Sequence, residues 1–239
     1  MSLPLSREPF IPDLIYVRDA DYRLRPLRRE DDPRRWLELV RSDEPIATAI
    51  AEITPGRGPE AVSSSTAPWL MERMISALDL RPGMKVLEIG TGTGFNAACL
   101  AALGASVVSV EIDPVIASQA RRALRGAGYD QVEVITGDGE RGAPARAPFD
   151  RVIVTAGTSR IPYRWVEQTR DGGRLVVPYS GEEHEGALLV LTVAGGIARG
   201  KAEGQAYFMP MRGQRLSYAS GKTRDDLKVE VGPDGQRFS

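Results

Sequence analysis

The fold is decided by residues 85–96, which read Lys85-Val86-Leu87-Glu88-Ile89-Gly90-Thr91-Gly92-Thr93-Gly94-Phe95-Asn96. Residues 85–89 are a short, mostly apolar run that is typical of a buried strand, and a helical pattern follows from Gly94 to Leu103. Glycines between a strand and a helix let the backbone turn sharply and let a ligand come close to the peptide chain. A dinucleotide fingerprint needs glycine at position 95, where this chain has Phe95. The spacing therefore favours a nucleoside without a pyrophosphate, and the alternative is a tight turn in a noncatalytic α/β domain.

Strand-like and helical patterns alternate on both sides of this motif. Strands that alternate with helices of this kind indicate a parallel α/β sheet. The last two strands are joined at Gly195-Gly196, which indicates an antiparallel edge. The expected fold class is α/β, with a doubly wound, mostly parallel seven-stranded sheet and an antiparallel edge strand. The expected strands are 85–89, 107–111, 132–136, 151–155, 174–178, 187–193 and 206–211, and the expected helices are 69–78, 94–103, 114–125 and 163–170.

Composition divides the chain into three zones. Residues 1–62 are rich in charges and prolines, with a short helix expected from Pro33 to Arg41 and a loop at 54–59. We expect this zone to be an N-terminal substrate-recognition segment and residues 63–214 to be the sheet domain. Residues 215–239 are polar and are expected to form a mobile tail. The hydroxyl cluster at residues 63–66 precedes an amphipathic helix, so it resembles a capping loop.

The composition limits which functions are open to the chain. Its 239 residues include 31 basic and 32 acidic side chains, a formal net charge of −1, which argues against general binding of nucleic acids or anionic membranes. No apolar run approaches about 18 residues and no signal peptide is recognisable, so we expect a cytoplasmic protein without a membrane span. One cysteine excludes an internal disulfide and a cysteine-based zinc site, and one histidine argues against a metal cluster. These shortages favour a function that depends on an organic cofactor.

Acidic residues follow two of the expected strands. Glu111 ends the second strand, 21 residues after Gly90, where a carboxylate can accept both ribose hydroxyls of an adenosine. Asp138 follows the third strand, between Gly137 and Gly139, and can accept a hydrogen bond from an adenine amine. Each acid alone is typical of a surface carboxylate. Together, at the carboxyl ends of consecutive strands, they predict an adenosine pocket.

Four blocks of sequence follow one another along the chain: Val86-Leu87-Glu88-Ile89-Gly90-Thr91-Gly92-Thr93-Gly94, Ser109-Val110-Glu111-Ile112-Asp113, Gly137-Asp138-Gly139 and Pro148-Phe149-Asp150-Arg151-Val152-Ile153-Val154-Thr155-Ala156. In this order they resemble the protein-L-isoaspartate O-methyltransferases, which are S-adenosylmethionine-dependent enzymes with a Rossmann-like fold. The resemblance covers about residues 63–180 and implies S-adenosylmethionine as the cofactor, with S-adenosylhomocysteine as the product. The positions that it assigns to cofactor binding are Ser64, Glu88, Gly90, Thr91, Gly92, Gly94, Asn96, Glu111, Ile112, Gly137, Asp138, Gly139 and Thr155.

The resemblance also implies how these residues divide the work. The loop from Gly90 to Gly94 and Glu88 surround the methionine part of the cofactor, Glu111 holds the ribose, and Asp138 with Gly139 lines the adenine. On the acceptor side the family carries Ser-x-Pro before a helix, and Thr66-Ala67-Pro68 matches it. Thr66, with Ser65 beside it, is therefore the candidate catalytic residue. The alternative is that these hydroxyl groups only cap the helix.

A carboxylate acceptor explains why few catalytic side chains suffice. An aspartyl or isoaspartyl carboxyl has an unperturbed pKa near 3.9, so it is an anion at pH 7 and needs no general base. The protein must place it in line with the methyl group, within about 3–3.5 Å, and exclude water. Hydroxyl and backbone N–H donors, such as Thr66 and the turn at 155–157, can orient the carboxylate without protonating it.

The N-terminal zone departs from the repair enzymes of this family. Phe10-Ile11-Pro12 comes almost at the start, and residues 13–62 then separate it from the serine cluster. The whole resembles an actinobacterial branch that modifies ribosomally made peptides such as graspetides and lanthipeptides. We therefore expect methylation of an aspartyl carboxylate in a peptide, which leads through the methyl ester to aspartimide or isoaspartate. The alternatives are general isoaspartyl repair in proteins, a noncatalytic nucleoside-binding module, and methylation of a small molecule or RNA.

Four other residues that often carry chemistry are expected to be structural. Cys99, Trp36 and Trp165 fit the apolar faces of helices and are expected to pack in the core. His184 lies in a polar stretch and is expected to be a solvated loop residue.

Overall fold

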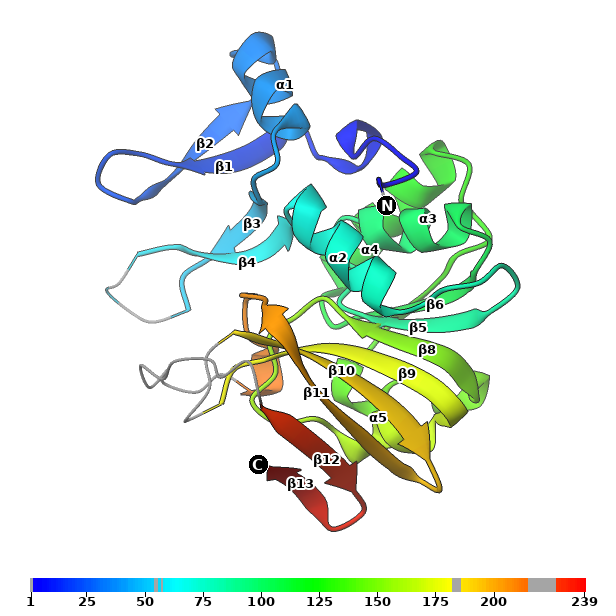
Figure 1. Cartoon of the computed structure of the whole chain (residues 1–239). Coiled ribbons are helices and arrows are strands. Elements are labelled where there is room, and N and C mark those ends of the chain that lie inside the picture. The colour runs from blue at the N-terminus through cyan, green and yellow to red at the C-terminus, as the bar shows by residue number, and fades with distance from the viewer. Residues whose placement is uncertain (1, 54–55, 57, 182–185, 215–226) are drawn as a thin grey trace.

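The computed structural model describes residues 2–53, 56, 58–181, 186–214 and 227–239, and its strands form two sheets (Figure 1). The strand order of the larger sheet is β13-β12-β11-β10-β9-β8-β5-β6-β7. Its parallel part consists of β5 (Lys85–Ile89), β6 (Ser106–Glu111), β7 (Glu133–Thr136), β8 (Phe149–Val154) and β9 (Thr169–Tyr179). Its antiparallel part consists of β10 (Ala187–Ala194), β11 (Ile197–Gln205), β12 (Lys228–Gly232) and β13 (Gly235–Phe238).

Apolar residues cover both faces of the parallel strands, which is why these strands are continuous hydrophobic runs. In β8, Val152 and Val154 join one hydrophobic cluster with Trp165, whereas Ile153 joins the opposite cluster. The second cluster also contains the buried faces of the helices on that side of the sheet. The helices on that side are α2 (Pro68–Ala77), α3 (Phe95–Ala102) and α4 (Pro114–Gly126), whereas α5 (Tyr163–Glu167) packs in the first cluster. No helix among the described residues is long and apolar enough to cross a bilayer.

The smaller sheet is antiparallel and has the order β2-β1-β3-β4. Together with α1 it forms what we term the N-terminal subdomain, residues 14–65, which stands beside the helices of the larger sheet in Figure 1. It has a hydrophobic cluster of its own, centred on Trp36 and Ile15, which are both fully buried. Its elements are β1 (Leu14–Arg18), β2 (Leu24–Arg28), α1 (Pro33–Arg41), β3 (Ile46–Ala51) and β4 (Glu60–Ser65). The predicted helix from Pro33 to Arg41 is confirmed, with Asp32 accepting from the N–H of Arg35 as its N-cap.

A buried arginine ties the N-terminal subdomain to the rest of the chain. The guanidinium of Arg7 donates to the carbonyl oxygens of Leu39 (3.0 Å) and Val40 (2.7 Å), near the end of α1. It also donates to Ser42 (2.7 Å), just beyond that end, and to Thr66 (3.5 Å), just before α2. Carbonyl groups at a helix end lack partners within the helix, so this arginine satisfies them while it joins two segments. Arg7 therefore fixes the N-terminal subdomain relative to the start of α2.

The structure confirms the α/β fold class and corrects several of its details. The larger sheet has nine strands among the described residues rather than seven, because residues 228–238 form β12 and β13. The expected mobile tail is therefore wrong for these residues, and its part at 215–226 lies outside the described residues. Val229 and Val231 are buried, and the turn at 232–235 reverses the chain between the two strands. These short strands were hidden by their polar neighbours.

Three element boundaries also differ from the expectation. Residues 206–211 do not form a strand, because the antiparallel partner of β10 is residues 197–205. The helix at 163 ends at Glu167, and β9 begins at Thr169. Residues 63–65 belong to β4 and pair with β3, so they are not a capping loop, and the expected boundary after residue 62 falls inside a strand. Helix α2 has no side-chain N-cap and begins at Pro68, a residue that suits the first turn.

The residues expected to be structural are placed accordingly. Cys99, Trp36 and Trp165 are fully buried, which confirms their packing role. His184 and part of the expected loop at 54–59 lie outside the described residues.

Candidate active site

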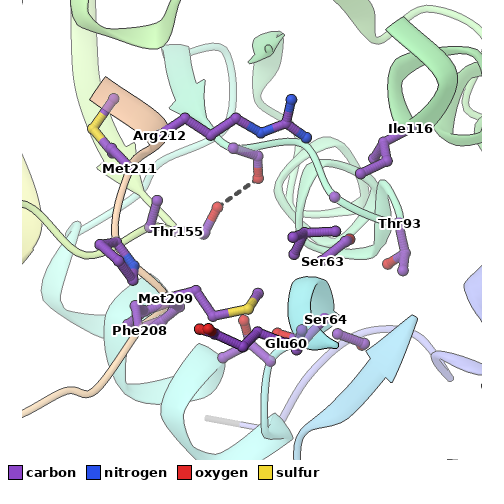
Figure 2. A pocket seen from close by; sticks show the side chains of 18 of the residues that line it. Glu60, Ser63, Ser64, Thr93, Ile116, Thr155, Phe208, Met209, Met211 and Arg212 are labelled. Carbon is purple, nitrogen blue, oxygen red and sulfur yellow. Dashed lines mark hydrogen bonds between the residues drawn. The ribbon is translucent and has the colours of Figure 1, made fainter. Parts of the chain in front are cut away.

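A cavity of about 1530 Å³ lies at the carboxyl ends of β5, β6 and β8, between the larger sheet and the N-terminal subdomain. Figure 2 shows side chains of both walls around one space, with Thr93 and Thr155 on the wall formed by the larger sheet and Ser63 and Ser64 on the wall formed by β4. Sites for one small ligand usually occupy about 300–1,000 Å³. The cavity therefore has room for two ligands.

The glycine loop after β5 forms the floor of the cavity. Gly90 has φ +96°, and a Cβ atom there would lie 3.0 Å from Thr155 Oγ1. Thr155 donates to the carbonyl of Gly90 (2.6 Å, dashed in Figure 2) and stands at the end of β8. Gly94 has a different task, since its Cα faces Leu124 of α4 and it does not line the cavity. Glycine at position 90 thus lets the end of β5 approach the end of β8 closely. Glycine at position 94 lets the start of α3 pack against α4.

Glu111 is held ready as an acceptor in the cavity wall. Only 8% of its surface is exposed, and its carboxylate accepts from the backbone N–H of Gly92 (3.0 Å) and of Asp113 (3.1 Å). Ile112 and Ile116 line the cavity beside it. A fixed carboxylate between a glycine loop and an apolar side chain matches the ribose position that the sequence predicts.

Asp138 and Gly139 lie together on the same wall. Asp138 Oδ1 accepts from the N–H of Glu140 (3.0 Å), and this bond fixes the side chain of Asp138. Asp138 and Gly139 both line the cavity. A Cβ atom at Gly139 would lie 2.6 Å from Ile89, so this position requires glycine. Gly137 does not line the cavity, and its N–H instead donates to the carbonyl of Glu111 (2.9 Å). Gly137 therefore supports the wall rather than forming it.

Glu88 lies beneath the glycine loop, not in the cavity wall. It is fully buried, and burial raises its pKa to about 7. Its carboxylate accepts from Asn96 Nδ2 (2.7 Å) and from the hydroxyl of Ser109, which in turn lies 2.6 Å from Thr91 Oγ1. The sequence predicted that Glu88 contacts the cofactor directly, and this buried position corrects that prediction. The carboxyl group holds Asn96 and Thr91, and those two residues line the cavity.

The acceptor side of the cavity is formed by β4 and the residue after it. Ser64, which the resemblance assigns to the cofactor, lines the cavity from this side, as do the candidate catalytic residues Ser65 and Thr66. Ser65 is 3% exposed, and its Oγ has no hydrogen-bond partner among the described residues. Buried hydroxyl groups normally have partners, so this one has unused hydrogen-bonding capacity beside the cavity. The structure thus brings the candidate catalytic residues to the cavity that contains the candidate cofactor residues.

Two further wall segments were missed or misread in the sequence. Residues 208–212 form a loop that lines the cavity. Two backbone hydrogen bonds hold this loop to Gly157: the N–H of Gly157 donates to the carbonyl of Met209, and the N–H of Met211 donates to the carbonyl of Gly157. Arg212 closes this loop onto the larger sheet through Asp113 (2.6 Å). The second segment, residues 18–25, comes from the β1–β2 hairpin. In the sequence, the interleaved charges of this segment indicated only a solvated face, so they did not predict that it lines the cavity.

The walls fit the cofactor that the resemblance implies. The absence of a side chain at Gly90 and Gly139 keeps the wall clear of clashes with Thr155 and Ile89. Glu111 supplies acceptors suited to ribose hydroxyls. Asn96 Oδ1 is a second buried oxygen without a partner among the described residues, and it suits the ammonium group of an amino acid. The fold and the site together define the class of Rossmann-like methyltransferases.

Comparisons with known proteins agree with this class. A solved protein-L-isoaspartate O-methyltransferase matches with a TM-score of 0.62 and 29% identity, over 73% of this chain and 54% of that chain. The crystal structure of a Plasmodium falciparum beta-aspartate methyltransferase (PCMT) in complex with S-adenosyl-L-homocysteine has the same fold. Its TM-score is 0.58 at 18% identity, over 73% of this chain and 83% of that chain.

The family itself is shown by sequence. The model of the family Protein-L-isoaspartate(D-aspartate) O-methyltransferase (PCMT) matches residues 51–216. The Protein-L-isoaspartate O-methyltransferase of Methanopyrus kandleri is 35% identical, over 85% of this chain and 88% of its own length. The enzyme of the same name from Gloeobacter violaceus is 45% identical, over 56% of this chain and 66% of its own length, slightly less than two thirds. The chain belongs to the PCMT family of S-adenosylmethionine-dependent methyltransferases.

Proposed function

We propose that this protein transfers a methyl group to the side-chain carboxylate of an isoaspartyl residue in a peptide or protein. The observation that carries the proposal is the two-walled cavity, which is lined by the nucleoside-type acceptors of the larger sheet and by the hydroxyl-bearing residues Ser65 and Thr66 of the acceptor side. The relatives reported above are all named for isoaspartate, which supports this acceptor. S-adenosylmethionine supplies the electrophilic methyl group when it is bound.

The residues of the larger sheet hold the cofactor in this proposal. Glu111 accepts from the ribose hydroxyls, Asp138 accepts from the adenine amine, and Asn96 Oδ1 accepts from the ammonium group. The glycine loop and Thr155 set the distance between the ligand and the backbone. Because backbone hydrogen bonds hold Glu111 before the ligand arrives, little reorganisation accompanies binding.

The residues of the acceptor side orient the substrate. Its carboxylate is an anion at neutral pH, because the unperturbed pKa is near 3.9. Ser65 and Thr66 donate hydrogen bonds to it without a full proton transfer, so the carboxylate stays nucleophilic. None of the described residues in the cavity wall is histidine or lysine, and this chemistry needs neither. Rate enhancement then comes from placement and from exclusion of water.

The finer hypothesis of aspartyl methylation in a ribosomally made peptide stays a prediction. The feature that favours it is the N-terminal subdomain, most of which precedes the residues matched by the family model. The names of the relatives favour the isoaspartyl acceptor instead. The cytoplasmic location also stays a prediction from the sequence.

One experiment separates these functions. Two peptides that differ only in an isoaspartyl or an aspartyl residue at one position are incubated with the enzyme and S-adenosylmethionine labelled in the methyl group. We expect label in the isoaspartyl peptide, released as methanol by mild base, because carboxyl methyl esters hydrolyse and methyl groups on nitrogen do not. Label in the aspartyl peptide alone would favour peptide tailoring. S-adenosylhomocysteine binding without any transfer would leave only a binding module.

A further inference from the structure

We propose that the tip of the β1–β2 hairpin, residues 18–25, recognises acidic residues that flank the methyl-acceptor residue of the substrate peptide. This inference rests on the proposed function and adds a substrate preference to it. The hairpin belongs to the N-terminal subdomain and precedes residue 51, where the match to the family model begins. A substrate preference encoded here would therefore depend on residues outside the part matched by the family model.

The hairpin tip forms one end of the cavity that holds the candidate active site. Arg18, Arg23 and Arg25 line the cavity, together with Asp21, Tyr22 and Leu24. The same cavity reaches Ser65 and Thr66 along β4. An extended peptide whose acceptor residue lies at β4 therefore has its flanking residues within this same space.

The tip is a rigid turn. The carboxylate of Asp19 accepts from the backbone N–H groups of Asp21 (3.0 Å) and Arg23 (2.9 Å) and from Arg25 Nε (2.8 Å). The hydrogen bond from Arg25 is the main cause that holds the pKa of Asp19 below its usual value. Tyr22 occupies the left-handed region at φ +59° and is 79% exposed. A non-glycine residue held in this conformation with its side chain displayed is a common feature of binding sites.

The charges of the two walls are separated. Arg25 is neutralised by Asp19, whereas Arg18 and Arg23 have no ion-pair partner among the described residues. Asp21 and Glu60 are the acids on this side of the cavity. On the opposite wall, Glu111 and Asp138 are acidic, and the arginine there is paired with Asp113. Two unpaired guanidinium groups at the acceptor end favour a carboxylate, which accepts two parallel hydrogen bonds from an arginine.

A peptide fits these charges better than a nucleic acid. The tip carries three arginines against two aspartates, and nucleic-acid binding depends on neutralising several phosphates. Two cations held in a fixed turn suit one or two carboxylates at defined positions. Recognition of this kind works by placement more than by a general positive field.

The test uses the full chain and three isoaspartyl peptides of equal length, with glutamate, glutamine or lysine on both sides of the acceptor residue. We expect kcat/KM for the glutamate peptide to exceed that for the glutamine peptide about tenfold, mainly through KM, with the lysine peptide last. Binding of the same peptides, measured by fluorescence anisotropy with S-adenosylhomocysteine present, should follow the same order. This second readout does not depend on turnover.

Arg23 is the residue to change, because its side chain has no hydrogen bond or ion pair with the described residues to lose. In Arg23→Ala the preference for glutamate should fall to about threefold or less, and in Arg23→Glu the lysine peptide should become the best. The matched control is Arg28→Ala, an exposed arginine of β2 outside the cavity, which should keep the tenfold preference.

Three results would overturn the inference. Equal affinity of the three peptides for the unmodified enzyme is the first, and an equal loss of preference in Arg28→Ala and Arg23→Ala is the second. The third is competition by an RNA oligonucleotide that is stronger than competition by the glutamate peptide. A failure of the proposed function is distinguishable from all three, because it would leave every peptide unmethylated whatever the order of the binding constants.

Discussion

The two walls of the cavity are built on different principles. The cofactor wall consists of the ends of parallel strands whose two faces are both covered, and its polar groups are held by backbone hydrogen bonds. The acceptor wall belongs to a four-stranded antiparallel sheet that has a small hydrophobic cluster around Trp36. Hydrogen bonds from Arg7 connect this sheet with the rest of the molecule. One wall is therefore rigid because the whole domain holds it. The other is a small attached unit with a hydrophobic cluster of its own.

The largest expected effect comes from removing the centre of the acceptor unit. Trp36 is fully buried and donates to the carbonyl of Pro12 (3.3 Å). Trp36→Ala should cost about 3–5 kcal/mol, which is more than so small a cluster can lose without opening. We expect peptide methylation to fall more than about tenfold, with the affinity for S-adenosylhomocysteine changed less than about threefold. Transfer of labelled methyl groups measures the first effect and calorimetric titration the second, and hydrogen exchange of residues 14–51 reports the opening of the subdomain.

The control for this variant is Trp69→Ala, since Trp69 is half exposed at the start of α2 and does not line the cavity. Trp69→Ala should alter neither the rate of peptide methylation nor the affinity for S-adenosylhomocysteine. Loss of cofactor affinity in Trp36→Ala as large as the loss of methylation would show that the two walls are one unit.

Beneath the cofactor wall lies a buried carboxyl group, Glu88, whose titration should tie the stability of the protein to pH. The folded-state pKa of Glu88 is raised to about 7 from a reference value of 4.5, so the folded state binds more protons than the unfolded state between these values. The free energy of unfolding should therefore fall as pH rises from about 4.5 to about 7 and stay low above it. Glu88→Gln should remove this fall and be the more stable form at pH 8, by about 3 kcal/mol or less. Urea unfolding at several pH values tests this, and parallel curves for the two proteins would contradict it.

Cofactor affinity should depend on Glu111. Its replacement by alanine removes the ribose acceptors and leaves the N–H of Gly92 without its partner. We expect the dissociation constant for S-adenosylhomocysteine to rise about 100-fold, which corresponds to about 2.7 kcal/mol. The matched control is Glu133→Ala, an acidic residue of β7 that pairs with Arg146 away from the cavity. Calorimetric titration of both variants gives the comparison, and equal affinities would remove Glu111 from the site.

The smallest expected effect is on the hydroxyl groups of the acceptor wall. Ser65→Ala removes a buried hydroxyl without a protein partner, so stability should stay the same or rise slightly. We expect kcat to fall about tenfold in this variant and in Thr66→Ala, with cofactor affinity intact. Thr192→Ala, an exposed threonine of β10, serves as the control. Unchanged turnover in both acceptor variants would mean that these residues only shape β4.

The sequence predicted the cofactor wall much better than the acceptor wall. The strand, glycine loop and helix at 85–103 combine periodicity, turn residues and an acid at a fixed distance, and these signals agree with one another. Glu88 was misplaced because a carboxylate near a strand end can face a ligand or lie beneath a loop, and spacing does not distinguish the two. Its partner Ser109 comes from the neighbouring strand, a contact that no local pattern indicates.

The acceptor wall was hidden for two physical reasons. Strand β4 ends in three serines, which suit a helix cap as well as a strand, and its pairing with β3 decides between them. Strand β2 contains Pro26, two arginines and no buried residue, as an edge strand exposed to solvent does. Both strands depend on partners rather than on their own hydrophobicity.

The order of strands in the larger sheet also governs when the site forms. Strand β5 lies between β6 and β8, and Thr155, whose hydroxyl holds Gly90, comes 65 residues later in the chain. Closing so long a loop is entropically costly, and contacts of this range form slowly during folding. Strand β6 holds part of the loop, since the N–H of Gly90 donates to Val110 and the N–H of Gly92 to Glu111. The contact of Gly90 with Thr155 is added only when β8 docks against β5, so we expect the ligand site to be complete no earlier than that step.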